Sequence, residues 1–250
     1  MVRGSAYTVT TVAHDIYDQD GLTTGHNHEF MRDRRFVAAY QRGVAAAGCD
    51  YGWHWRVHIG LWAARTAVRL PGDFVECGVN RGFMSSAIME DLSWDRTGKR
   101  FYLLDTFQGL DERYVSDDER AEGILEKNST LMASGFYVQG AESVRRNFAQ
   151  WRDVTIIEGA IPDTLSQAGT GPFAFLHLDL NCAPPEVAAL HYFWPKLVTG
   201  AVVLLDDYGY AGYRQQRLAM DAAAERLGVT VASLPTGQGL LIKPESDACA

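Results

Sequence analysis

The chain is predicted to form an α/β fold with a doubly wound, mostly parallel seven-stranded sheet and an N-terminal helical extension. From residue 71 onward, short apolar runs alternate with helical segments across short connections, as in repeated β-α-β units. Two of these runs, residues 173–178 and 201–205, lead directly into acidic residues, as expected where buried strands end at a site. The last two runs flank residues 235–239, whose Pro and Gly predict a hairpin and an antiparallel edge.

The first 70 residues form the predicted extension. Residues 1–30 are polar, and we expect them to be partly disordered or to form a lid over the site. A helix is expected at 29–47, with one apolar face formed by Phe30, Phe36, Val37, Tyr40 and Val44. A second helix is expected at 54–70, before Pro71 and Gly72, with a stripe of Trp55, Ile59, Trp62 and Leu70. The many aromatic residues of these two helices predict contacts with a second copy of the chain, and therefore a homo-oligomer.

Strands and helices alternate through the second predicted unit, residues 71–250. Strands are expected at 74–79, 101–105, 154–158, 173–179, 201–206, 229–234 and 240–243. Helices are expected at 82–92, 140–151, 161–168, 185–197 and 212–227. The long polar stretch 108–134 is expected to be a loop, and loops of this length are frequently lids.

Composition excludes several classes of function. The 250 residues carry 23 basic and 31 acidic side chains, a net charge of −8, without a basic patch, so no nucleic-acid partner is expected. The four cysteines are scattered, which disfavours a disulfide framework or a zinc site. No apolar stretch approaches the roughly 20 residues that span a bilayer, and no signal peptide is visible. These features predict a cytoplasmic protein without a membrane partner.

The first predicted strand of the sheet ends in a glycine loop, Glu76-Cys77-Gly78-Val79-Asn80-Arg81-Gly82. Glycines there let the backbone approach a ligand, and the following helix N-terminus favours an anion. The spacing is not GxGxxG, which disfavours NAD. The next strand ends at Asp105, where an acid is placed to accept hydrogen bonds from ribose hydroxyls. This order of motifs favours an adenosyl ligand, the alternative being turn glycines and a helix-capping acid.

Three acids follow two other predicted strands. Asp179 follows one strand, and Asp206 and Asp207 follow the other. If these strands are neighbours, their carboxylates converge, and uncompensated carboxylates so close together repel. A hard divalent cation with oxygen ligands is the simplest compensation. The alternative for each acid alone is a solvated turn or a helix cap.

Five blocks in one order resemble the macrocin O-methyltransferase (TylF-like) family. They span residues 73–79, 104–110, 159–165, 176–179 and 204–208. The resemblance implies a class I, Rossmann-like methyltransferase domain that uses S-adenosyl-L-methionine and Mg²⁺ to methylate hydroxyls of small molecules. The expected acceptor is a deoxysugar or glycosylated natural product. The implied metal ligands are Asp179, Asp206 and Asp207, and the implied cofactor residues are Glu76, Gly78, Arg81, Asp105, Gly109, Gly159 and Ile161.

The chain departs from the family at one position of its expected catalytic pair, Asp179 and Asn181. Relatives commonly carry a second acid, the proposed general base, where this chain has Asn181, and an amide cannot take that proton. His177 shares a face with Asp179 but is expected to be a satisfied core histidine. Two alternatives therefore stay open. The acceptor is a catechol or other polyphenol, whose hydroxyl ionises more easily, or the chain binds the cofactor without catalysis.

Overall fold

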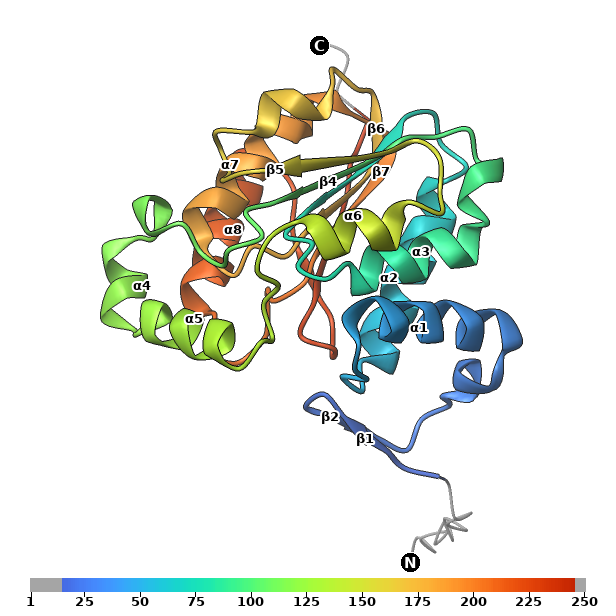
Figure 1. Ribbon diagram of the computed structural model, residues 1–250. Coiled ribbons are helices and arrows are strands. Elements are labelled where there is room, and N and C mark those ends of the chain that lie inside the picture. Colours follow the sequence, from blue (N-terminus) through green and yellow to red (C-terminus); the bar gives the residue numbers. More distant parts are fainter. Residues whose placement is uncertain (1–14, 246–250) are drawn as a thin grey trace, which may run out of the picture.

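The computed structural model describes residues 15–245 and confirms the predicted α/β fold (Figure 1). Its large sheet has seven strands in the order β5-β4-β3-β6-β7-β9-β8. The first five strands are parallel and β9 and β8 are antiparallel, as predicted. The strands are β3 (Asp73–Cys77), β4 (Phe101–Asp105), β5 (Val154–Glu158), β6 (Phe173–Leu178), β7 (Leu197–Leu205), β8 (Ala232–Ser233) and β9 (Gly239–Ile242).

The strand order reverses between β3 and β6. From β3 the chain moves outward to β4 and β5, then returns to the other side of β3 for β6 and β7. Ligands of open α/β sheets bind in the crevice beyond the carboxyl ends of the strands at such a switch point. The neighbouring strands β6 and β7 bring Asp179 and Asp206 to this same edge of the sheet.

Helices cover both faces of the sheet. One face packs against α1 (Arg34–Ala47), α2 (His54–Ala67), α3 (Phe83–Leu92) and α6 (Glu142–Phe148). The other face packs against α7 (Ala183–Phe193) and α8 (Arg214–Arg226). Single-turn 3-10 helices lie between these elements, at Glu29–Arg32, Trp94–Arg96, Glu112–Tyr114, Leu165–Ala168 and Trp194–Lys196.

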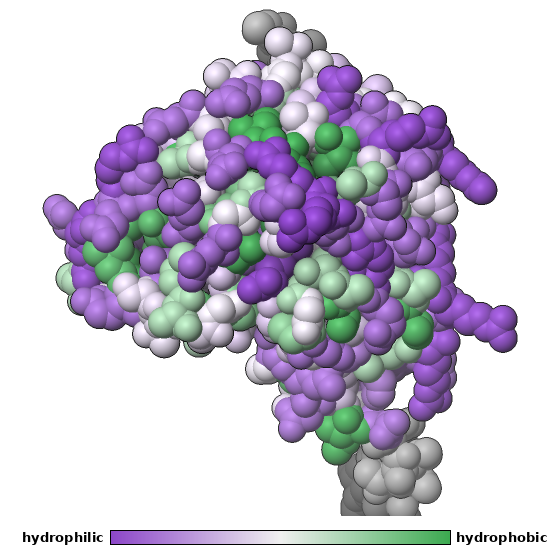
Figure 2. All heavy atoms as spheres, in the orientation of Figure 1, coloured by the Kyte–Doolittle hydropathy of each residue, from purple (hydrophilic) through white to green (hydrophobic). Residues whose placement is uncertain are grey.

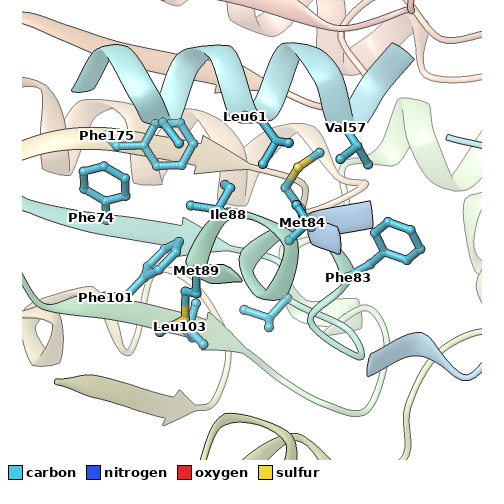
Figure 3. Close-up of a cluster of buried hydrophobic side chains, with 14 of the residues drawn as sticks. Val57, Leu61, Phe74, Phe83, Met84, Ile88, Met89, Phe101, Leu103 and Phe175 are labelled. Atoms are coloured by element: carbon cyan, nitrogen blue, oxygen red, sulfur yellow. The ribbon is translucent and has the colours of Figure 1, made fainter. Parts of the chain in front are cut away.

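Alternating strand side chains build two separate cores. Phe74 and Phe175 belong to the core beneath α2 and α3, whereas Val75 and Leu176 belong to the core beneath α7 and α8. Figure 3 shows Leu61 of α2 and Ile88 of α3 pointing into the first of these cores. This burial holds α2 against the sheet and fixes the residues at its N-terminal end over the switch point.

The extension differs from the prediction in the buried faces of its two helices. Before them, a short hairpin, β1 (Tyr17–Gln19) and β2 (Leu22–Thr24), forms in the segment expected to be partly disordered or a lid, and the role of a lid stays a prediction; residues 1–14 lie outside the description. The expected stripe of α2 is wrong, because Trp62 is 45% exposed and the buried face is Arg56, Val57, Gly60, Leu61, Ala63, Ala64 and Ala67. The face of α1 shifts similarly, since Val37 is 42% exposed while Ala39, Gly43 and Ala47 are buried. In both helices, small residues form the face that packs most closely against the rest of the fold. A prediction based on bulky apolar side chains misses such a face.

The stretch 108–134 is not the loop we expected. It contains α4 (Asp117–Ala121) and α5 (Ile124–Ala133), the green pair beside the sheet in Figure 1. Ser116 and Glu119 form a reciprocal capping box that starts α4. Glu119 is buried and also accepts a hydrogen bond of 2.6 Å from the backbone N–H of Ala183, at the start of α7. The charge run thus includes a structural residue that ties this segment to the sheet domain.

Smaller differences concern element boundaries. The helix expected at 161–168 is only a 3-10 turn over its last four residues. The strand expected at 201–206 already begins at Leu197, and the one expected at 229–234 shortens to two residues. None of these shifts moves a predicted site residue away from the carboxyl edge.

The drawn surface does not identify a face for binding a partner. On the face drawn in Figure 2, apolar residues occur in small patches among hydrophilic ones. Within residues 15–245, no helix is both long and apolar enough to cross a membrane. Homo-oligomer formation stays a prediction.

Candidate functional site

A cavity of about 420 Å³ opens at the carboxyl edge of the sheet. This volume falls within the range of small-molecule sites, roughly 300–1,000 Å³. The predicted cofactor, catalytic and metal residues line it, with the exception of Gly159. Gly159 instead donates its backbone N–H to the carbonyl of Asp105 at 2.9 Å, joining the ends of β5 and β4.

Gly78 shapes the cavity through the backbone. It has a φ of +90°, and a Cβ at this position would collide with the carbonyl oxygen of Asp179. The adjacent amide of Asp179 donates to the carbonyl of Cys77 at 2.8 Å. The glycine therefore keeps the chains beyond β3 and β6 in contact, which brings the glycine loop beside the acidic residues.

Asp105 organises the glycine loop. Its Oδ2 accepts hydrogen bonds from the backbone N–H groups of Val79 and Asn80, both at 2.7 Å, and its Oδ1 accepts one from Phe107 at 2.6 Å. A carboxylate has about four acceptor positions, so little capacity remains for ribose hydroxyls. Asp105 thus positions the glycine loop in the wall of the cavity, and its contact with a ribose stays a prediction.

Two further predicted residues connect the cavity to α5. Arg81 donates from Nη2 to the carbonyl of Gly135 at 2.7 Å. The Thr106 hydroxyl donates to the carbonyl of Gly109 at 2.6 Å, and the next amide, Leu110, donates to Asn128 Oδ1 at 3.0 Å. Helix α5, whose Lys127 and Leu131 line the cavity, is therefore held beside the two loops that carry Arg81 and Gly109.

Glu76, a buried residue of the cavity lining, offers an unused acceptor. Its Oε1 lies 2.9 Å from His177 Nδ1. Its Oε2 is buried and has no hydrogen-bond partner among the described residues. A buried carboxylate oxygen without a partner is costly, so this atom is suited to a cationic group of a ligand.

The three predicted metal ligands converge, but a guanidinium occupies the space between them. Arg56 of α2 directs Nη1 to Asp206 Oδ2 at 2.5 Å and to Asp207 Oδ1 at 3.2 Å. The same nitrogen lies 3.1 Å from the backbone carbonyl of Asp206, and Nε lies 3.1 Å from Asp20 Oδ2. Arg56 is 3% exposed, so it compensates these acids inside the fold.

Other hydrogen-bond donors complete the surroundings of Asp206. Gln238 Nε2 donates to Asp206 Oδ1 at 3.0 Å, and His177 Nε2 lies 3.5 Å from the same oxygen. Burial alone would raise the pKa of Asp206, but Arg56 and His177 hold that pKa well below its usual range. Burial alone would lower the pKa of His177, but Asp206 and Glu76 raise it to about 10. The two neighbouring carboxylates thus favour the protonated form of His177.

The pKa values of the two remaining acids, Asp207 and Asp179, shift in the opposite direction to that of Asp206. Burial and the neighbouring charge of Asp206 raise the pKa of Asp207 to about 6. Burial, Asp206 and Asp207 raise the pKa of Asp179 well above its ordinary value. Asn181 donates from Nδ2 to Asp179 Oδ1 at 3.2 Å, so it supports Asp179 and accepts no proton from it.

This donor set does not fit the expected magnesium ion. Mg²⁺ requires free carboxylate oxygens in near-octahedral geometry and usually retains several waters. Here Asp206 and Asp207 accept hydrogen bonds from a buried arginine. Within residues 15–245, no group of three or more His, Cys, Asp or Glu side chains is arranged to hold a metal ion.

Arg56 and Asp20 are two charged site residues that the sequence did not predict. Asp20 lies in the turn of the β1–β2 hairpin, whose Gln19 Oε1 lies 2.6 Å from His54 Nδ1 at the start of α2. The one signal for Arg56 is its place on a helix face that otherwise consists of small and apolar residues. A charge on such a face requires a partner, although the sequence does not say which one.

Solved structures share this fold. A structure of the O-methyltransferase NovP matches 82% of this chain and 89% of its own, with a TM-score of 0.65 and 21% identity. The calicheamicin methyltransferase CalS11 matches 76% of this chain and 79% of its own, with a TM-score of 0.61 and 18% identity. At these identities the likeness establishes the class I methyltransferase fold.

Curated relatives match part of the chain. A tetracenomycin-C derivative 4'-O-methyltransferase of Streptomyces olivaceus, whose substrate name includes a dimethoxy-rhamnosyl group, is 32% identical over 56% of this chain and 54% of its own length. Demethyldecarbamoylnovobiocin O-methyltransferase of Streptomyces niveus is 31% identical over 56% and 53%. The chain thus spans about half the length of these relatives. Residues 62–230 match the family model of macrocin-O-methyltransferase (TylF), and the chain belongs to that family.

Proposed function

We propose that this chain transfers a methyl group from S-adenosylmethionine to a hydroxyl of a small molecule, and that the acceptor is a sugar of a glycosylated natural product. The observation that carries the proposal is the cavity at the switch point, with the unpartnered Glu76 Oε2 among its buried atoms. Family membership supports the reaction type, and the relatives' names, which describe O-methylations of natural products, support the acceptor class.

The residues of the cavity fit the cofactor. Glu76 Oε2 is suited to the ammonium of the methionine part, and the start of α3 to its carboxylate. Ile161 and Ala160 supply apolar wall suited to an adenine ring. S-adenosylmethionine, when bound, supplies an electrophilic methyl group on a sulfonium. The chain's task is to hold an acceptor oxygen in line with that methyl group and to exclude water.

The acceptor would lie between the acidic residues and the aromatic wall of the cavity. That wall includes Trp53, Phe136, Tyr137, Tyr210 and Tyr213. Aromatic faces pack against the apolar surfaces of sugars and of planar aglycones, while acids accept hydrogen bonds from hydroxyls. Both kinds of group are therefore available to a glycoside.

Two candidates for the proton acceptor are unsuited to that role. Asn181 is an amide, and Glu76 and Asp206 favour the protonated form of His177. Because Asn181 cannot act as a base, an acceptor hydroxyl that ionises readily would suit this site. The catechol or polyphenol alternative is therefore tested beside the sugar. Magnesium dependence is a prediction from the family that the contacts of Arg56 argue against, and no step of the proposal requires it.

Calorimetry with S-adenosylhomocysteine tests the proposal first. We expect one molecule to bind per chain, and no binding at high micromolar concentration would refute the cofactor assignment. Methyl transfer from labelled S-adenosylmethionine onto glycoside and catechol acceptors then separates the two acceptor classes. Tight binding of the cofactor product without transfer to any acceptor would identify the non-catalytic alternative.

A further inference from the structure

We propose that the guanidinium of Arg56 is the resident cation of the acidic cluster (Asp20, Asp179, Asp206 and Asp207) and replaces the divalent metal that the family resemblance implies. The inference rests on the proposed function, because it concerns the acceptor side of the same cavity. It predicts that the folded chain binds no divalent cation at this cluster and that methyl transfer proceeds in the presence of a chelator.

The first argument is the position of the guanidinium. Arg56 Nη1 contacts a carboxylate oxygen of both Asp206 and Asp207, the two consecutive acids expected to share a metal. A metal ion that bridged these two oxygens, Asp206 Oδ2 and Asp207 Oδ1, would have to occupy the volume that this nitrogen fills. Two cations so close together would also repel each other.

The second argument is that both carboxylate oxygens of Asp206 already accept hydrogen bonds. Its Oδ2 accepts from Arg56, its Oδ1 accepts from Gln238, and its backbone carbonyl accepts from Arg56 at 3.1 Å. Asp179, the third expected ligand, receives the amide of Asn181 in the position where relatives carry an acid. Both expected metal strands therefore end in carboxylates that are bound by N–H donors.

The third argument is that Arg56 is fixed in place. Its guanidinium lies over the rings of Trp53 and Tyr210, at 5.7 and 5.1 Å from their centroids. Asp20 holds Nε from the β1–β2 hairpin, and the side chain is 3% exposed. Its rotation out of the cluster would require movement of the hairpin and of both aromatic walls.

The arrangement also leaves one donor for a ligand. The hydrogen bonds of Arg56 with described residues use Nε and Nη1. Arg56 lines the cavity, so Nη2 is the nitrogen through which it would hold an oxygen of the acceptor. Arginine in this role orients the hydroxyl and stabilises negative charge on it without a metal.

Titration with Mn²⁺, followed by electron paramagnetic resonance, tests the inference directly on the full chain. We expect wild-type protein to bind no Mn²⁺ up to millimolar concentration and its melting temperature to be unchanged by Mg²⁺ or EDTA. Arg56→Ala empties the centre of the cluster, so it should gain one Mn²⁺ site and should melt at a higher temperature when Mg²⁺ is added. One Mn²⁺ bound tightly by wild type, or no gain in the variant, would overturn the inference.

Two variants control this experiment. Arg65→Ala removes a guanidinium of the same helix that pairs with Asp91 at 2.6 Å, outside the cavity, and should gain no site. Arg56→Lys keeps the positive charge and should also exclude Mn²⁺. If Arg56→Ala does not fold, the wild-type titration alone decides the inference. S-adenosylhomocysteine binding is measured on the same samples. Failure of the proposed function then appears as absent nucleoside binding, and failure of this inference as Mn²⁺ bound by the wild type or no Mn²⁺ gained by Arg56→Ala.

Discussion

The two halves of the cavity satisfy their buried polar groups in different ways. In the half beside β3 and β4, which we call the cofactor half, Asp105 accepts hydrogen bonds from backbone amides only a few positions from the strand ends. In the acidic cluster, compensation comes from Arg56, which is 150 residues from Asp206 along the chain. The cofactor half is thus built from two consecutive strands and the loops that follow them, whereas the acidic cluster depends on how the extension folds over the sheet.

The largest effect should come from removal of the cation of the acidic cluster. Arg56→Ala leaves two buried carboxylates without their partner, and breaking a buried ion pair in this way costs about 3–5 kcal/mol. Urea denaturation in metal-free buffer measures this loss in the free energy of unfolding. Arg65→Ala should lose less, because Arg65 is partly exposed and Asp91 keeps Arg35. Equal losses would show that the two arginines play equivalent roles.

The next effect should fall on the cofactor half. Glu76→Gln removes the charge that we assign to the methionine ammonium, and hydrogen bonds to charged groups contribute about 1.5–3 kcal/mol. Calorimetry should therefore show S-adenosylhomocysteine affinity reduced by about ten- to a hundredfold. Unchanged affinity, with unchanged stability, would remove Glu76 from the cofactor site.

Asp105→Asn should weaken the same half by a different route. The amide retains one acceptor oxygen, so at least one of the N–H groups of Val79, Asn80 and Phe107 loses its partner. The loop should become less ordered, and nucleoside affinity should fall about tenfold or less. Faster hydrogen exchange at Val79 and Asn80 would accompany the loss, and its absence would count against the positioning role.

The last prediction is a pH dependence of stability from a buried acid behind the acidic cluster. Burial raises the pKa of Glu186 from 4.5 to about 8. Between these values the folded state keeps a proton that the unfolded state has released, so the contribution of Glu186 to stability is lost as pH rises toward 8. Thermal melts from pH 5 to pH 8 should show a smaller decline in Glu186→Gln than in wild type. An identical decline would exclude Glu186 as its source.

The same contrast explains what the sequence could predict. The sheet followed from local apolar runs, and Asp105, Asp179 and Asp206 followed from the ends of those runs. Arg56 could not be found in this way, because its partners are set by the packing of α2 against the carboxyl edge. Helix α4 was not predicted because its run of charged residues is typical of a solvated loop. Only the folded chain shows that one of them, the capping residue Glu119, is buried.

Calorimetric titration of the wild-type chain with S-adenosylhomocysteine, once in EDTA and once in Mg²⁺, tests the central claim most directly. That claim is that a nucleoside cofactor binds beside an acidic cluster whose resident cation is Arg56. It predicts binding of one molecule per chain with the same affinity in both buffers. Absence of binding in both, or binding that requires Mg²⁺, would contradict it.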